Sequence, residues 1–108
     1  MSCQIRCALW DLISREAELP ALNKLILLTI ANYTEPYRSK TPVPISLIVR
    51  DTRIPETDLR KFFTSLERGH WIEKTLVPND EGRPPITVYH LAPRLLRAAQ
   101  RQTDQPHP

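Results

Sequence analysis

The segment VPISLIVRDTRIPETDLRKFFTSLERGHWI, residues 43–72, decides the fold. In its first part, Ile45, Ile48 and Val49 lie at helical spacing and predict about two turns of helix over residues 45–52. The two residues that follow turn the chain sharply. The segment therefore opens with a short helix that ends in a tight turn.

The segment continues with the clearest amphipathic helix of the chain, predicted over residues 55–68. Its apolar positions i, i+3, i+4 and i+7 are Leu59, Phe62, Phe63 and Leu66. Proline suits the first helical position, here Pro55. Gly69 stands where a helix C-cap belongs. A short helix, a tight turn and a second helix with one apolar face form a helix-turn-helix unit.

Downstream of this unit the residue types change to those of strands. Residues 71–77 and 86–91 are rich in β-branched and aromatic side chains, and turn-forming residues gather between them at 78–85. We therefore predict a β-hairpin with a long, charged tip. Helical spacing of Leu and Ala after Pro93 predicts a last helix, and residues 102–108 are expected to fray.

Upstream of the unit the sequence predicts two helices. Residues 5–16 form an amphipathic pattern, and Pro20 opens a second helix that is apolar almost all round. We expect this second helix to be buried between other elements. A polar loop over residues 35–42 and a short extended piece at Val43–Pro44 lead into the decisive segment.

The chain as a whole has the length of one domain. Its 108 residues are 41% hydrophobic and 25% charged, which is typical of a globular protein. We predict an α+β, mostly helical domain over residues 1–101 and a flexible tail over residues 102–108. The longest apolar run, residues 25–30, is far shorter than the roughly 20 residues of a membrane span. No membrane partner is expected.

The net charge and the cysteines bound the function further. Fifteen Lys and Arg against 12 Asp and Glu give a net charge of +3, which permits a polyanionic partner without requiring one. The amino terminus lacks the long apolar region of a secretory signal. Two cysteines do not make a disulfide framework, so a reducing cytoplasm is the expected location.

The decisive segment carries a recognisable pattern. Residues 51–54 occupy the turn, Leu59 and Phe63 occupy the inward sites of the second helix, Leu66 takes the next such site, and residues 71–72 lead into the hairpin. This pattern resembles the winged helix-turn-helix domains of phage and plasmid replication proteins and of small bacterial transcriptional regulators. The resemblance covers about residues 19–91 and implies a bacterial or phage- or plasmid-encoded protein.

The resemblance implies binding of double-stranded DNA by a recognition helix over about residues 55–68 and a wing over about residues 77–86. Two departures from the pattern matter. Arg53 stands at a turn position that is usually small, and Pro55 replaces the usual Ser or Thr N-cap. A phosphate-binding hydroxyl that some relatives carry there is therefore missing.

The outward face of the predicted recognition helix supplies most of the expected DNA contacts. Arginine and lysine bind guanine edges or phosphates, and threonine contacts the backbone or a thymine methyl group. The alternative is an ordinary solvated face. The residues expected to contact DNA are Arg53, Thr57, Arg60, Lys61, Thr64, Arg68 and, on the wing, Arg83.

Acidic residues favour an alternative function. Glu56 and Asp58 stabilise the start of the helix but repel phosphates, and Asp80 and Glu81 precede Arg83 on the hairpin tip. The alternative is therefore a winged helix that acts as a protein-interaction or inhibitory module and does not bind DNA. Two acid-free stretches, residues 36–50 and 82–103, point back to a polyanion if they lie on the recognition-helix side.

No catalytic or metal-binding constellation is evident. Cys3 and Cys7 share a helical spacing but lack two further ligands nearby, and the three histidines are scattered. The sequence also lacks a glycine-rich phosphate loop and a nucleophile motif. We therefore expect no enzyme activity, no metal and no cofactor.

The terminal helices suggest a homodimer, which implies a two-fold symmetric DNA site with half-sites about one helical turn apart. Their apolar residues either pair between two subunits or cover the core of their own chain. These residues are Ile5, Leu9, Trp10 and Leu12 at the amino end and Leu91, Leu95 and Leu96 at the carboxyl end.

Overall fold

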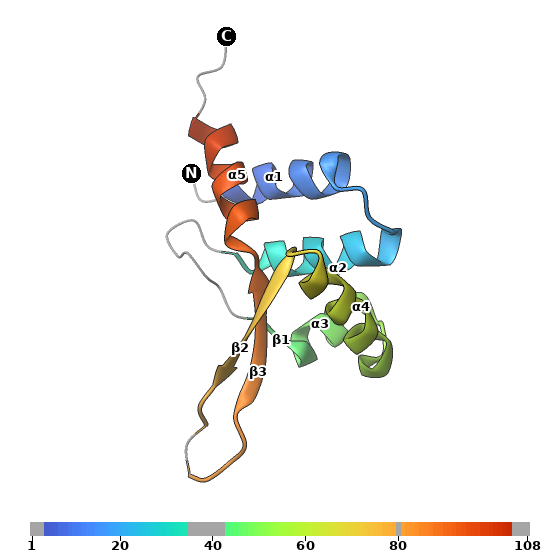
Figure 1. The fold of residues 1–108 in the computed structure, drawn as a ribbon, viewed down its shortest axis with the longest axis vertical. Coiled ribbons are helices and arrows are strands. Elements are labelled where there is room, and N and C mark those ends of the chain that lie inside the picture. The colour runs from blue at the N-terminus through green and yellow to red at the C-terminus, as the bar shows by residue number, and fades with distance from the viewer. Residues whose placement is uncertain (1–3, 35–42, 80, 105–108) are drawn as a thin grey trace.

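The computed structural model describes residues 4–34, 43–79 and 81–104 and has an α+β, mostly helical fold (Figure 1). The polar loop expected at residues 35–42 lies outside the described residues. The elements in chain order are α1 (Gln4–Asp11), η1 (Leu12–Glu16), α2 (Ala21–Asn32), β1 (Val43–Pro44), α3 (Ile45–Thr52), α4 (Glu56–Arg68), β2 (Ile72–Val77), β3 (Ile86–Leu91) and α5 (Pro93–Asp104).

The first predicted helix is helical over its expected range, but its hydrogen bonding changes midway. The α-helix α1 passes directly into the π-helical turn η1, where the backbone N–H of Ala17 donates to the carbonyl oxygen of Leu12. The hydroxyl of Ser14 donates to the carbonyl oxygen of Trp10 at 2.6 Å, a local bond that competes with the helix ladder. The apolar spacing alone does not predict this widened turn.

Helix α2 is only partly enclosed. One side packs against α1, α3 and β3, and Ile26, Leu27 and Ile30 are fully buried there. The outward residues Leu22 and Leu25 remain 45% and 39% exposed. The expectation that α2 is buried between other elements is therefore confirmed where it packs against α1, α3 and β3, whereas the described elements leave these two leucines uncovered.

Helices α3 and α4 are joined by the short turn that the sequence predicts. Arg53 takes the left-handed conformation (φ 63°), and its backbone N–H donates to the carbonyl oxygen of Val49 to close α3. The hydroxyl of Thr52 donates to the carbonyl oxygen of Ile48 and accepts from the backbone N–H of Ile54. The turn therefore satisfies its own polar groups.

Helix α4 buries its apolar face and ends in a hydrogen-bonded cap. Leu59, Phe63 and Leu66 are at most 1% exposed. Gly69 is the C-cap, as predicted, but its φ is −82° and the left-handed residue is His70 (φ 59°). The N–H groups of His70 and Trp71 return to the carbonyl oxygens of Glu67 and Leu66, the bonds of a Schellman motif.

The sheet is antiparallel with the strand order β1-β3-β2. The predicted hairpin pairs Ile72 with Leu91 at its base and Val77 with Ile86 at its outer end. On its other side, the central strand β3 pairs with β1 at two described residues, Val88 and Tyr89. All four residues at 88–91 are buried, whereas the outer end of the hairpin extends away from the helices (Figure 1).

The carboxyl-terminal helix α5 closes the molecule by packing against α1. Leu95 and Ala99 are 2% and 0% exposed and join the same core as Ile5 and Leu9. Helix α5 continues to Asp104, past the start of the expected tail, and residues 105–108 lie outside the described residues.

Candidate nucleic-acid interface

The outward side of α4 carries a row of residues that we call the α4 crest, namely Thr57, Lys61, Thr64 and Arg68. Their spacing of i, i+4, i+7 and i+11 aligns them along the helix, opposite the buried face. All four residues are exposed. The crest therefore exposes two cations and two threonine side chains and contains no carboxylate.

The other charged residues of α4 lie beside the crest. Nη2 of Arg60 lies 3.1 Å from a carboxylate oxygen of Glu56, one turn earlier. Lys61 forms no ion pair with a described residue. The hydroxyl of Thr64 donates to the carbonyl oxygen of Arg60 at 3.0 Å, so this hydroxyl is already engaged by its own helix. Three cations on α4 are expected to contact guanine or phosphate. Arg60 is paired with Glu56, whereas Lys61 and Arg68 form no ion pair with a described residue.

A second ion pair links α4 to the hairpin. Nζ of Lys74 on β2 lies 3.9 Å from a carboxylate oxygen of Glu67. The register pairs Lys74 with Tyr89, and the Tyr89 ring stacks against Phe63 of α4 at 4.1 Å between ring centroids. The pKa of Tyr89 is raised, first by burial and then by the nearby carboxylate of Glu67. Lys74 therefore lies on the α4 side of the sheet.

Lys74 is a charged residue of this region that the sequence analysis missed. Strand alternation puts Lys74 on the same face of the strand as Ile72 and Leu76. Which face meets α4 depends on the packing of the two elements, and the spacing within one strand does not contain that information.

Arg53 and Arg83 lie on either side of α4 in the chain. Arg53 is exposed in the turn before α4, and Arg83 is exposed in the hairpin loop. Neither forms an ion pair with a described residue. Glu81 in the same loop is also exposed, so the tip carries charges of both signs.

Arg50 of the first acid-free stretch is held in a cluster at the end of α2. It donates to Asp51 and to the Tyr33 hydroxyl, both at 2.9 Å, and Tyr33 donates to the other carboxylate oxygen of Asp51. The hydrogen bond from Tyr33 is the main cause of a lowered pKa for Asp51, and it raises the pKa of Tyr33 in turn. Arg38 and Lys40 lie outside the described residues.

Arg94 of the second acid-free stretch fastens α5 to the end of α4. Its guanidinium donates to the carbonyl oxygens of His70 (2.8 Å) and Gly69 (3.2 Å), and it lies over the Trp71 ring at 4.3 Å. Arg94 therefore caps α4, where cations are favoured, rather than standing free for a ligand.

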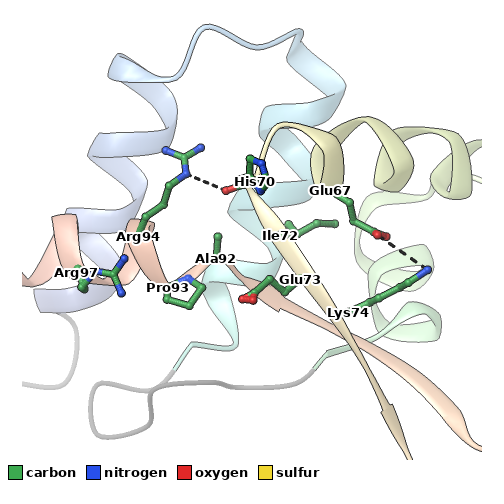
Figure 2. Close-up of a pocket in the computed structure, with 9 residues that line it drawn as sticks. All are labelled: Glu67, His70, Ile72, Glu73, Lys74, Ala92, Pro93, Arg94 and Arg97. Carbon is green, nitrogen blue, oxygen red and sulfur yellow. Dashed lines mark hydrogen bonds and ion pairs between the residues drawn. The ribbon is translucent and has the colours of Figure 1, made fainter.

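A groove of about 620 Å³ runs between the end of α4, the start of β2 and the start of α5 (Figure 2). Arg94 and Arg97 lie at one end, and the Glu67–Lys74 pair lies at the other. Ile72, Ala92 and Pro93 provide its apolar lining. The groove therefore borders the flank of α4 that faces the hairpin.

Cys7, His70 and His90, the cysteine and histidines among the described residues, do not gather into a metal site. Cys7 is exposed, and Cys3 lies outside the described residues. His90 is buried on β3, with Nε2 3.3 Å from the Thr75 hydroxyl. Within residues 4–34, 43–79 and 81–104, no three His, Cys, Asp or Glu residues come together as metal ligands, and no helix is long and apolar enough to cross a membrane.

The two apolar stripes that suggested a dimer are largely used inside the chain. Ile5 and Leu9 from α1 and Leu91 and Leu95 near α5 are at most 7% exposed and belong to one core. Trp10 is the exception, with 43% of its surface exposed. Leu12 and Leu96 are partly buried against the same core. The four buried residues therefore cover the core of their own chain, and the homodimer stays a prediction.

Comparison of the chain with protein-family models, with curated protein sequences and with solved structures found no match.

Proposed function

We propose that this chain is a winged helix-turn-helix protein that binds double-stranded DNA, with α4 as the recognition helix and the β2–β3 hairpin as the wing. It serves as a small transcriptional regulator or as an accessory replication protein of a phage or plasmid. The single observation that carries the proposal is the α4 crest, an exposed row with cations and threonine side chains but no carboxylate.

The arrangement of the elements supports this proposal. A helix, a short turn and a second helix are followed directly by a hairpin, and a short strand before α3 completes the sheet in the order β1-β3-β2. An α-helix fits the major groove of B-DNA, where side chains of an exposed row reach base edges and phosphates. In this docking Lys61 and Arg68 meet the duplex, Arg53 lies near the backbone and Arg83 extends from the wing.

The test is a salt titration of binding to duplex DNA with the Lys61→Ala variant. Loss of one phosphate contact makes the negative slope of log K against log salt shallower by about 0.9, and the affinity falls as well. Lys24→Ala is the matched control, because Lys24 lies on α2 and its ammonium donates to the carbonyl oxygen of Ser14. Wild-type affinity and slope in Lys61→Ala contradict the proposed docking.

A module that binds a protein is the second candidate, and one observation favours it. Trp10, Leu22 and Leu25 expose 43%, 45% and 39% of their surfaces on α1 and α2. Tryptophan is enriched at protein interfaces, and exposed apolar surface marks interaction sites when it forms a large patch. Absence of binding to any duplex at low salt, together with saturable binding of a defined protein that Trp10→Ser abolishes, selects this candidate.

A further inference from the structure

Two acidic residues of α4 lie on the same side of the helix and each holds a cation. Glu56 and Glu67 are eleven positions apart, which is three turns, so their side chains align along one flank. Glu56 pairs with Arg60 at 3.1 Å and Glu67 pairs with Lys74 at 3.9 Å. The flank of α4 that faces the hairpin therefore carries two cations, each paired with a carboxylate.

Both ion pairs are accessible to a competing anion. The side chains of Arg60 and Glu56 are 63% and 53% exposed, and those of Lys74 and Glu67 are 60% and 31% exposed. Exposed pairs of this kind are weak, because water solvates both partners. A dense row of phosphates, which releases counterions when it binds a cation, competes effectively with a single solvated carboxylate.

We propose that Glu56 and Glu67 act as positioning residues that hold Arg60 and Lys74 until DNA phosphates replace the two carboxylates. The inference rests on the proposed DNA binding and adds Lys74 to the contact surface. The two acids weaken binding to every duplex, because each carboxylate competes with a phosphate for its cation. A strand of the DNA backbone then follows the flank between α4 and the hairpin, beside the groove of Figure 2.

The experiment measures binding of a short duplex of random sequence by fluorescence anisotropy at several salt concentrations. Glu56→Gln and Glu67→Gln are each made alone, and each is also combined with loss of its partner, Arg60→Ala or Lys74→Ala. Asp58→Asn is the control, because it removes the same charge from α4 at a residue that pairs with no described cation. Thermal melting of each variant verifies that the fold is intact.

We expect each Gln variant to raise the affinity roughly two- to fivefold more than Asp58→Asn does. This extra gain disappears when the partner cation is absent. Lys74→Ala alone weakens binding and makes the slope of log K against log salt shallower by about 0.9. Lys24→Ala leaves both the affinity and the slope unchanged.

Two results overturn the inference while leaving DNA binding in place. One is a gain in Glu56→Gln or Glu67→Gln no larger than that of Asp58→Asn, and the other is a gain that persists without the partner cation. Absence of duplex binding by the wild-type chain and all variants at low salt overturns the proposed function itself.

Discussion

At the scale of single residues, the cluster of Tyr33, Arg50 and Asp51 links the end of α2 to α3. Asp51 accepts hydrogen bonds from both neighbours, and these bonds favour its charged form, so its pKa lies below the ordinary value. A carboxyl group with a lowered pKa in the fold stabilises the fold above its unfolded pKa. That contribution is lost as the pH falls through the lowered value.

Tyr33→Phe is expected to return the pKa of Asp51 toward its ordinary value, because the bond from Tyr33 is the largest cause of the shift. A carbon-detected NMR titration of the Asp51 carboxyl measures it. Tyr89→Phe removes a phenol elsewhere and leaves the titration unchanged. The unfolding free energy lost in Asp51→Asn should also shrink as the pH falls through the lowered pKa; a loss independent of pH contradicts the assignment.

Gly69 permits a close approach rather than a special backbone angle. A Cβ at this position meets the Trp71 ring at 2.7 and 2.8 Å, although φ is an ordinary −82°. Gly69→Ala should therefore destabilise the protein by about 1–3 kcal/mol in urea unfolding. In a Trp71→Ala background the same substitution should be neutral or stabilising by up to about 1 kcal/mol, because Ala restricts the unfolded chain. An equal cost in both backgrounds contradicts this explanation.

Residue types and spacing predicted the candidate site only in part. The period of α4 predicts which residues are exposed, so the α4 crest follows from the sequence, and the Glu56–Arg60 pair has the i, i+4 spacing of a helical ion pair. The Glu67–Lys74 pair and the bonds of Arg94 join different elements. Such contacts depend on how helices and strands pack, and no local pattern encodes them.

At the scale of elements, the side chain of Arg94 links the start of α5 to the cap that follows α4. Arg94 donates hydrogen bonds to the carbonyl oxygens of Gly69 and His70 and lies over the Trp71 ring. Arg97, one turn later, forms no hydrogen bond with a described residue. Arg94→Ala should lower the unfolding free energy by about 1–2 kcal/mol, since it removes charge-assisted hydrogen bonds and a cation–π contact that are partly screened by solvent. Chemical denaturation measures the loss.

Arg97→Ala is the matched control for this prediction and should change stability by no more than about 0.5 kcal/mol. Arg94→Lys keeps the charge but lacks the planar fork, so it should recover only part of the loss. Equal stabilities of the Arg94→Ala and Arg97→Ala variants contradict the capping role.

The elements themselves were largely predictable. Proline and glycine separate them, and the change from helical to strand composition after Trp71 predicts the hairpin. The π-helical turn η1 and the exposed side of α2 were not predicted. The first depends on a switch in hydrogen-bond partners, and the second depends on which elements pack against α2.

At the scale of the whole molecule, the two ends of the described chain close one core. Leu95 and Ala99 of α5 pack with Ile5 and Leu9 of α1. Ending the chain after Ala92 should abolish cooperative thermal unfolding, because the lost core contacts rival the 5–15 kcal/mol that stabilises a typical domain. Ending it after Asp104 should preserve the melting temperature. A cooperative transition in the shorter chain contradicts a single core.

The outer part of the hairpin, unlike this core, has little support from other elements. Among the described residues, β1 pairs with β3 at Val88 and Tyr89, and Leu76 farther out is 63% exposed. Lengthening a loop such as the one at residues 78–85 costs only about 0.6 kcal/mol per doubling. Mutation and insertion can therefore remodel the tip over evolutionary time, or a designer can graft a new one, while the domain beneath keeps its architecture.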